Sequence, residues 1–279
     1  MKRSTLLIIT GLIFLNIPCR NNSDLYVRDV RQPVISLNGI WDVCLLPYDT
    51  IIKSDASSLK WYKAEVPGEC MMQGIPVMHD KPFVYMTRLL IPDDFRGKLV
   101  KLRFEGVYSY SRVWLNGTYI RDHHGGFTAW DCDITQAVNP GEEAVLHVEV
   151  TDRADEISYA SGYAKHQIGG ILRNVSLLSL PENHPESVMI TTDLDETYDN
   201  AILKVEGSTR LTGEKSEISL ELHDPDNRKI KLDSPDLKIS GKDFVITNHI
   251  KKPFKWEAEH PVLYRLTVEY SEKGKVEWR

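Results

Sequence analysis

The feature that most constrains the fold is the rhythm of short apolar runs along the chain. From Pro33 onward, segments rich in Val, Ile, Leu and aromatic residues recur, and Gly, Pro, Asn and Asp separate them. Long stretches with the 3.6-residue period of an amphipathic helix are absent. This pattern is typical of a β-sandwich or barrel, because each short strand buries one face and then ends at a turn. The sequence therefore predicts an all-β fold.

Two segments show the pattern at residue level. Lys98–Phe104 alternates polar with apolar side chains, which predicts a half-buried strand. Ser111–Leu115 and Thr118–Arg121 flank the pair Asn116-Gly117. Because both residues of such a pair tolerate positive φ, the pattern predicts a tight β-hairpin.

The length of 279 residues suggests about two domains at ~100–200 residues each. Two prolines and several polar residues interrupt the strand rhythm at Leu180–Pro185, and we place the boundary there. The predicted domains are residues 33–182 and 185–274. Five strands are expected in the second domain: Ser187–Thr192, Ala201–Glu206, Glu217–His223, Phe244–Ile250 and Leu263–Tyr270.

The first residues are typical of a secretory signal. Met1-Lys2-Arg3 is basic, and Leu6–Leu15 is almost wholly apolar. That run is about ten residues, whereas a membrane-spanning helix needs roughly 20. We therefore expect residues 1–23 to direct export to the periplasm or the outer membrane of a bacterium. Cys19 partly matches a lipoprotein box, so a lipid-anchored form stays open as an alternative.

Composition excludes several classes of function. The net charge of −6 argues against a nucleic-acid partner, which would need a basic excess. The four cysteines form no C-x-x-C pair, and Asp122-His123-His124 places adjacent histidines on opposite faces of an extended chain. We predict no metal site and no cofactor. Phosphate loops and a Gly-x-Ser-x-Gly elbow are also absent from the sequence.

A run of motifs resembles the sugar-binding domain of glycoside hydrolase family 2. It consists of Phe104–Gly117, then His124–Phe127, then Asp131–Thr135. Further segments match the same family in order: Leu37–Trp41, Val66–Gly68, Gly169–Val175 and, in a following immunoglobulin-like domain, Trp256–Tyr264. The resemblance implies a jelly-roll β-sandwich followed by a smaller immunoglobulin-like sandwich.

The resemblance also implies where the chemistry lies. Members are typically retaining β-glycosidases, which use two carboxylates about 5–5.5 Å apart. In the family both belong to a (β/α)₈ barrel of ~250 residues, for which this sequence has no room. The family's acid/base glutamate follows an asparagine, and no Asn-Glu dipeptide occurs here. We therefore predict no catalytic residue in this chain and no hydrolysis by it alone.

The candidate sugar contacts are side chains that stack on sugars or hydrogen-bond to them. The family's first domain lends loops to the active site, and at those stretches this chain has His79–Pro82 and Ser161–Gln167, which match the family's Asn and Asp poorly. We nominate five residues as substrate-binding: Trp130, Tyr159, Tyr163, Lys165 and His166. Alternatively, these residues have plain loop roles.

Other aromatic and acidic residues are interpreted structurally. The simplest role for large aromatic rings is to fill the core of a sandwich. We assign this role to Trp41, Phe104, Trp114 and Trp256. The acidic stretch with Asp152, Asp155 and Glu156 is expected to be a solvated charge cluster.

Three functional hypotheses follow. The first is the non-catalytic N-terminal part of an exported β-galactosidase-like enzyme, which frames the active site of a barrel partner and contacts a carbohydrate. The second is a stand-alone carbohydrate-binding protein. The third is a structural module that forms homo-oligomer contacts. The sequence leaves open the sugar and its linkage, the oligomeric state and whether Arg279 is a biological end.

Overall fold

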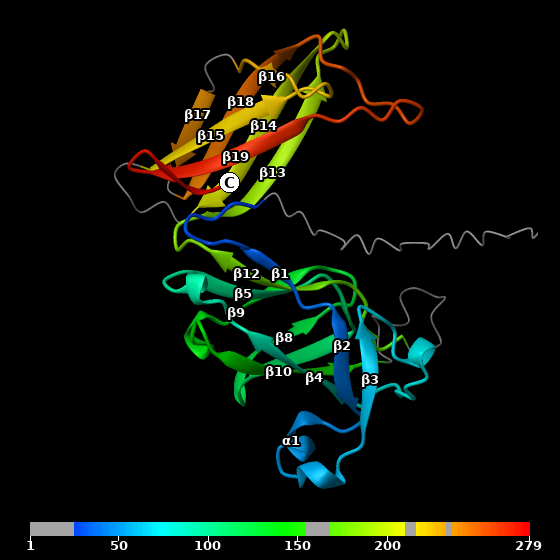
Figure 1. The fold of residues 1–279 in the computed structure, drawn as a ribbon. Helices are drawn as coiled ribbons and strands as arrows, with labels where there is room; N and C mark the ends of the chain where they lie inside the picture. Colours follow the sequence, from blue (N-terminus) through cyan, green and yellow to red (C-terminus); the bar gives the residue numbers. More distant parts are fainter. Residues whose placement is uncertain (1–24, 154–167, 210–215, 233–235, 241) are drawn as a thin grey trace, which may run out of the picture.

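The computed structural model describes residues 25–153, 168–209, 216–232, 236–240 and 242–279 (Figure 1). The predicted signal segment 1–23 lies outside these residues. Nearly all the regular structure is β, which confirms the predicted fold class. In the described part of the chain, no helix has the length and apolar character needed to cross a membrane.

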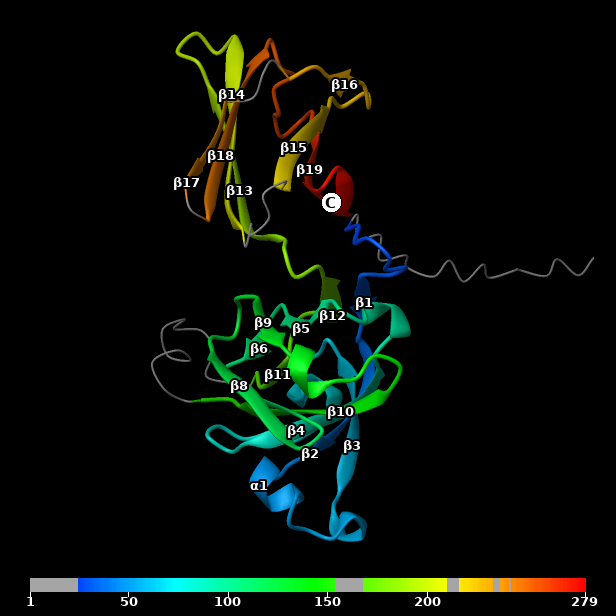
Figure 2. The same cartoon turned by 90° about the vertical axis from the view of Figure 1, so that its left-hand side faces the viewer.

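The first group of strands forms a sandwich (Figures 1 and 2). Its four-stranded sheet has the order β1 (Val34–Ser36), β12 (Val175–Leu180), β5 (Leu99–Phe104) and β9 (Trp130–Asp133). Its six-stranded sheet has the order β3 (Trp61–Val66), β2 (Gly39–Cys44), β4 (Phe83–Leu90), β10 (Glu143–Thr151), β7 (Tyr110–Leu115) and β8 (Thr118–His124). A two-stranded sheet pairs β11 (Gly170–Ile171) with β6 (Val107–Tyr108).

Helical structure is limited to short turns in this sandwich. It comprises α1 (Tyr48–Ile51), η1 (Ala56–Ser58), η2 (Met71–Gln73), η3 (Asp93–Phe95) and η4 (Thr135–Ala137). The largest of the buried clusters fills the space between the two sheets and includes Trp41, Phe83 and Phe104. Trp114 is also buried, but in a separate small cluster where it stacks on Tyr48 at 4.1 Å.

The hairpin predicted at Asn116-Gly117 is confirmed. Asn116 has φ of 48° and Gly117 has φ of 83°, so both residues occupy the left-handed region that this turn requires. The Asn116 side-chain oxygen also accepts a hydrogen bond from the backbone N–H of Val145 at 2.8 Å. The turn thereby fixes the β7–β8 hairpin to the neighbouring strand β10.

The second group of strands forms a smaller sandwich after Leu180. One sheet has the order β13 (Pro185–Leu194), β14 (Asn200–Thr209), β18 (Asp243–Lys251) and β17 (Asp236–Ser240). The other has the order β16 (Lys229–Ile230), β15 (Ser216–His223), β19 (Arg265–Glu272) and β20 (Lys275–Trp278). The five predicted strands are confirmed with slightly different bounds, and the additional strands β16, β17 and β20 are short.

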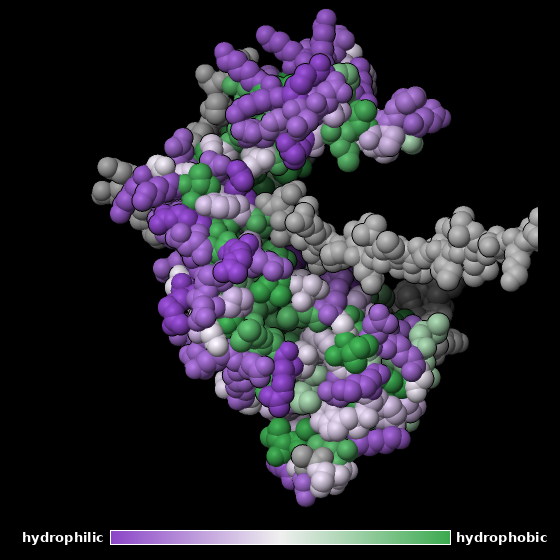
Figure 3. Space-filling model, in the orientation of Figure 1, coloured by the Kyte–Doolittle hydropathy of each residue, from purple (hydrophilic) through white to green (hydrophobic). Residues whose placement is uncertain are grey.

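The prediction that Trp256 is a core residue is wrong. Its side chain is 61% exposed, because residues 252–264 form no strand between β18 and β19 and the connection projects from the sandwich (Figure 1). Hydrophobic side chains gather at the base of this projection (Figure 3). The core of this domain is built instead from residues such as Val205, Phe244 and Tyr270.

Candidate functional site

A buried carboxylate organises the loops at one end of the first sandwich. Asp152 directly follows β10 and has no solvent-exposed surface. Its Oδ2 accepts hydrogen bonds from the backbone N–H groups of Ile168 and Gly169, at 2.8 and 3.1 Å. Because a buried charge is tolerated only when it is paired or hydrogen-bonded, these two donors explain how Asp152 is accommodated.

The other oxygen of the same carboxylate faces a histidine. His79 Nδ1 lies 3.2 Å from Asp152 Oδ1, and the His79 side chain is 28% exposed. The distance is that of an ion pair, although the angles are not those of a hydrogen bond. The backbone N–H of Asp80 also donates to the Asp152 carbonyl at 2.8 Å. Asp152 therefore contacts His79–Pro82, the first of the stretches that the family resemblance marks as substrate-facing, and the backbone of Ile168 and Gly169, which directly follow the second.

Close backbone contacts explain the glycine pair beside this carboxylate. A Cβ atom on Gly170 would lie 2.7 Å from the Gly68 carbonyl oxygen, a distance that side chains do not tolerate. The backbone N–H of Gly68 donates to Ile171 at 2.8 Å, and that of Cys70 donates to Gly169 at 3.2 Å. The approach of the two backbone segments therefore leaves no space for a side chain at Gly170.

Cys70 and Tyr85 lie behind the glycine pair. Cys70 Sγ and the Tyr85 hydroxyl are 3.0 Å apart, and both side chains are fully buried. Burial raises the pKa of Cys70 to about 11 and raises the pKa of Tyr85 well above its usual value. Cys70 therefore packs as a core residue, in surroundings that disfavour the thiolate form.

Of the five nominated sugar contacts, only Trp130 lies within the described residues. Its side chain is 7% exposed and stacks on Phe104 at 4.6 Å and on His123 at 4.7 Å. The Arg121 guanidinium lies 5.5 Å from the ring. The indole therefore presents little surface to a sugar. Tyr159, Tyr163, Lys165 and His166 lie outside the described residues.

The adjacent histidines of the sequence are separated by the sheet. His123 packs on Trp130 on the inner side, and burial lowers its pKa. The His124 ring lies tilted against that of Tyr110, with the ring centres 4.4 Å apart. Across the described segments, no group of three His, Cys, Asp or Glu side chains is arranged to hold a metal ion.

The expectation that Asp152 belongs to a solvated charge cluster is wrong. The residue is fully buried, while Asp155 and Glu156 lie outside the described residues. Sequence reasoning missed the pairing with His79 because the partners are far apart along the chain. The one sequence signal that pointed to burial of Asp152 was its position directly after the alternating strand β10.

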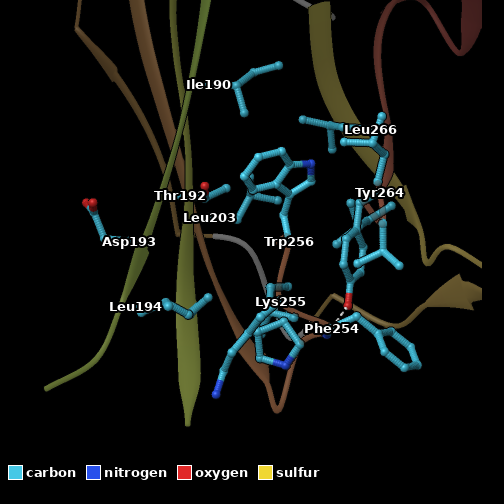
Figure 4. A pocket seen from close by; sticks show the side chains of 16 residues that line it. Ile190, Thr192, Asp193, Leu194, Leu203, Phe254, Lys255, Trp256, Tyr264 and Leu266 are labelled. Atoms are coloured by element: carbon cyan, nitrogen blue, oxygen red, sulfur yellow. Dashed lines mark hydrogen bonds between the residues drawn. The ribbon is translucent and has the colours of Figure 1, made fainter. Parts of the chain in front are cut away.

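A groove opens between the two sheets of the second sandwich. It has a volume of about 550 Å³, and apolar side chains such as Ile190, Leu203 and Leu266 line most of it. Trp256 projects into its centre, and the Tyr264 hydroxyl accepts a hydrogen bond from the Phe254 N–H at 2.8 Å (Figure 4). Asp193 is the single carboxylate among its lining residues, so the groove lacks the pair that a retaining glycosidase needs.

Comparisons with known proteins agree with this architecture. Residues 71–181 match the model described as "Glycosyl hydrolases family 2, sugar binding domain", and residues 184–278 match "Glycosyl hydrolases family 2". A β-galactosidase of Vibrio vulnificus is 29% identical over 271 residues, which cover 84% of this chain and 25% of that protein. A β-galactosidase of Clostridium acetobutylicum is 28% identical and covers 90% of this chain.

A solved structure shows the same fold. The β-glucuronidase of Ruminococcus gnavus in complex with uronic isofagomine superposes with a TM-score of 0.69 at 22% identity. The match covers 88% of this chain and 43% of that one.

These findings define the chain as a pair of β-sandwich domains. It belongs to glycoside hydrolase family 2. It spans about a quarter of the length of the curated relatives it matches.

Proposed function

We propose that this chain is the non-catalytic N-terminal region of an exported β-galactosidase-like enzyme, and that its first domain presents loops to a catalytic barrel. The observation that carries the proposal is the Asp152 carboxylate. It contacts His79, in the first of the stretches expected to face substrate, and the backbone of Ile168, directly after the second. The β-galactosidase names of several curated relatives support the choice of sugar.

The first test is the size of the native product. An antibody against residues 33–180 should detect, in the source organism, a protein well above the 31.9 kDa of this chain. That product should hydrolyse a chromogenic β-galactoside, whereas the purified 279-residue chain should not. A native product at or below 31.9 kDa would remove the hydrolase proposal.

Export is tested separately by N-terminal sequencing of the native protein. We expect cleavage within or directly after residues 1–23, and a lipid-modified Cys19 would identify the lipoprotein form. A native protein that retains Met1 and stays in the cytoplasm would contradict export.

A second function, glycan binding by the chain alone, is favoured by Phe127. This side chain is 56% exposed on the first domain, and its ring lies 5.3 Å from that of Tyr108. An exposed ring held by a buried neighbour is a surface on which a sugar can stack. Retention on immobilised galactan that Phe127→Ala abolishes would support this function, and no retention of the parent chain would exclude it.

A further inference from the structure

The polypeptide that precedes the first sandwich pairs with the last strand of the second one. The backbone N–H of Tyr26 donates to the Arg279 carbonyl at 2.7 Å, and that of Arg279 donates back to Tyr26 at 3.0 Å. The N–H of Arg28 donates to the Glu277 carbonyl at 3.1 Å. Val27 lies opposite Trp278 in this antiparallel pairing. We call residues 26–28 together with residues 277–279 the clasp.

The clasp covers an edge of the second domain. Strand β20 is the last strand of its sheet, so one row of its backbone groups has no partner within that sheet. Residues 26–28 supply the missing partners and extend the sheet by a short strand. Figures 1 and 2 both show the blue segment that leads into β1 beside the C-terminus.

Side chains of the clasp contact both cores. Val27 is fully buried and belongs to the core of the first sandwich. Trp278 packs against that core and against the core of the second sandwich. The clasp therefore joins two hydrophobic cores that otherwise contain no common residue among the described clusters.

Charge complementarity strengthens the pairing. The Arg28 guanidinium forms an ion pair with the Glu277 carboxylate, whose side chain is 16% exposed. The Arg279 guanidinium lies 5.5 Å from the centre of the Tyr26 ring, within the range of a cation–π contact. Because Glu277 is mostly shielded from water, its pair is screened less than an exposed ion pair would be.

We propose that the clasp is an interdomain lock, in which residues 26–28 hold the second domain in a fixed orientation to the first. The linker after Leu180 is the covalent connection, and its Asn183 side chain donates to Glu272 at 2.8 Å. A single connection allows rotation of one domain against the other. The clasp adds a second connection at a different point of the chain, so it restricts that rotation.

The clasp extends the second domain beyond its predicted boundaries. Its stable unit includes residues 26–28 from the N-terminal part of the chain, although the predicted domains 33–182 and 185–274 exclude both halves of the clasp. A chain that begins at residue 31 should therefore lose interdomain order; it also loses Val27 and Val30 from the first core, while the remainder of both cores is kept.

A charge reversal tests the lock. In Arg28→Glu, three carboxylates come together at residues 28, 29 and 277, and we expect amide hydrogen exchange at residues 277–279 to become roughly tenfold faster. The double variant Arg28→Glu/Glu277→Arg restores opposite charges and should return exchange to the parent rate. Arg96→Glu is the matched control, because it reverses an arginine paired with Asp93 in an exposed loop of the first domain.

Three results would overturn the proposal. Exchange at residues 277–279 that is unchanged in Arg28→Glu, or unchanged in a chain that begins at residue 31, would show that the pairing contributes nothing. A mass by light scattering of two chains, which falls to one chain on removal of residues 26–28, would show that the strand comes from a second copy.

Discussion

At the scale of single residues, the first domain buries several ionisable side chains: the carboxylate of Asp152 and three cysteine thiols. Asp152 is held by two backbone donors and by His79. The cysteines within the described residues, Cys44, Cys70 and Cys132, are free and buried. All these groups are buried in the fold.

Asp152→Ala should destabilise the first domain. Removing the carboxylate leaves the backbone N–H groups of Ile168 and Gly169 without their acceptor, at a cost of about 1–3 kcal/mol in the free energy of unfolding. Urea unfolding monitored by tryptophan fluorescence measures this loss. Glu143→Gln, at the exposed far end of the same strand, is the control and should change stability little. Equal stability of the two variants would contradict the assigned role of Asp152.

Alkaline pH should weaken the fold through the buried thiols. Burial raises the pKa of Cys70 to about 11 and that of Cys132 to about 12, from an ordinary thiol value of 9.0. Between these values the unfolded chain has released thiol protons that the folded chain retains, so the unfolded state binds fewer protons and stability falls as pH rises. The expected result is a lower melting temperature at pH 10 than at pH 8.

The double variant Cys70→Ala/Cys132→Ala controls for other groups that titrate at alkaline pH. It should melt at a lower temperature at pH 8 because it leaves cavities, but the further decrease between pH 8 and pH 10 should be smaller. An equal pH dependence in the parent and the double variant would contradict this assignment.

At the scale of elements, turn residues and edge strands determine how neighbouring strands are arranged in the sheets. The β7–β8 hairpin depends on two residues with positive φ, and its neighbour β10 is aligned by the Asn116 side chain. The edge strand β20 depends on residues 26–28 for backbone partners. Local signals explain the first of these elements, whereas the second requires a partner at the other end of the chain.

Gly117→Ala should destabilise the hairpin by about 1 kcal/mol, because an L side chain at φ of 83° is strained. No atom lies within 4 Å of the added Cβ, so the cost is conformational and not steric. Thermal unfolding should show a lower midpoint than in Thr118→Ala, the exposed neighbouring control. An unchanged midpoint would mean that the turn relaxes to another type.

At the scale of the whole molecule, two sandwiches are joined by a linker and by the clasp. Each domain has its own hydrophobic core, and Trp278 contacts both of them. The orientation of the domains therefore depends on a side chain near the end of the chain. In a longer enzyme, the same contacts would fix the direction in which the polypeptide leaves the second domain relative to the loops of the first.

Trp278→Ala should affect both domains, with a loss of about 2–4 kcal/mol shared between them, because truncating this large, partly buried side chain removes contacts with both cores. Hydrogen exchange measured separately in β5 and β15 should become faster in both strands. Leu263→Ala is the control, since that side chain is 73% exposed and belongs to neither core cluster. An effect confined to β15 would show that Trp278 belongs to the second domain alone.

Much of this architecture was predictable from the sequence because its causes are local. Strand alternation in residues 98–104, the Asn116-Gly117 turn and the punctuation between apolar runs each depend on neighbours within a few residues. The sequence by itself therefore determined the all-β class, five strands of the second domain and, through its motifs, the family.

Only the tertiary structure decided which distant residues meet. The pairing of Asp152 with His79, the exposure of Trp256, the burial of Trp130 between other rings and the clasp all join or separate positions far apart in the chain. Periodicity reports which face of a strand is apolar, but it does not report which other segment covers that face. Such contacts are set by the packing of complete sheets, and that is why they required the three-dimensional structure.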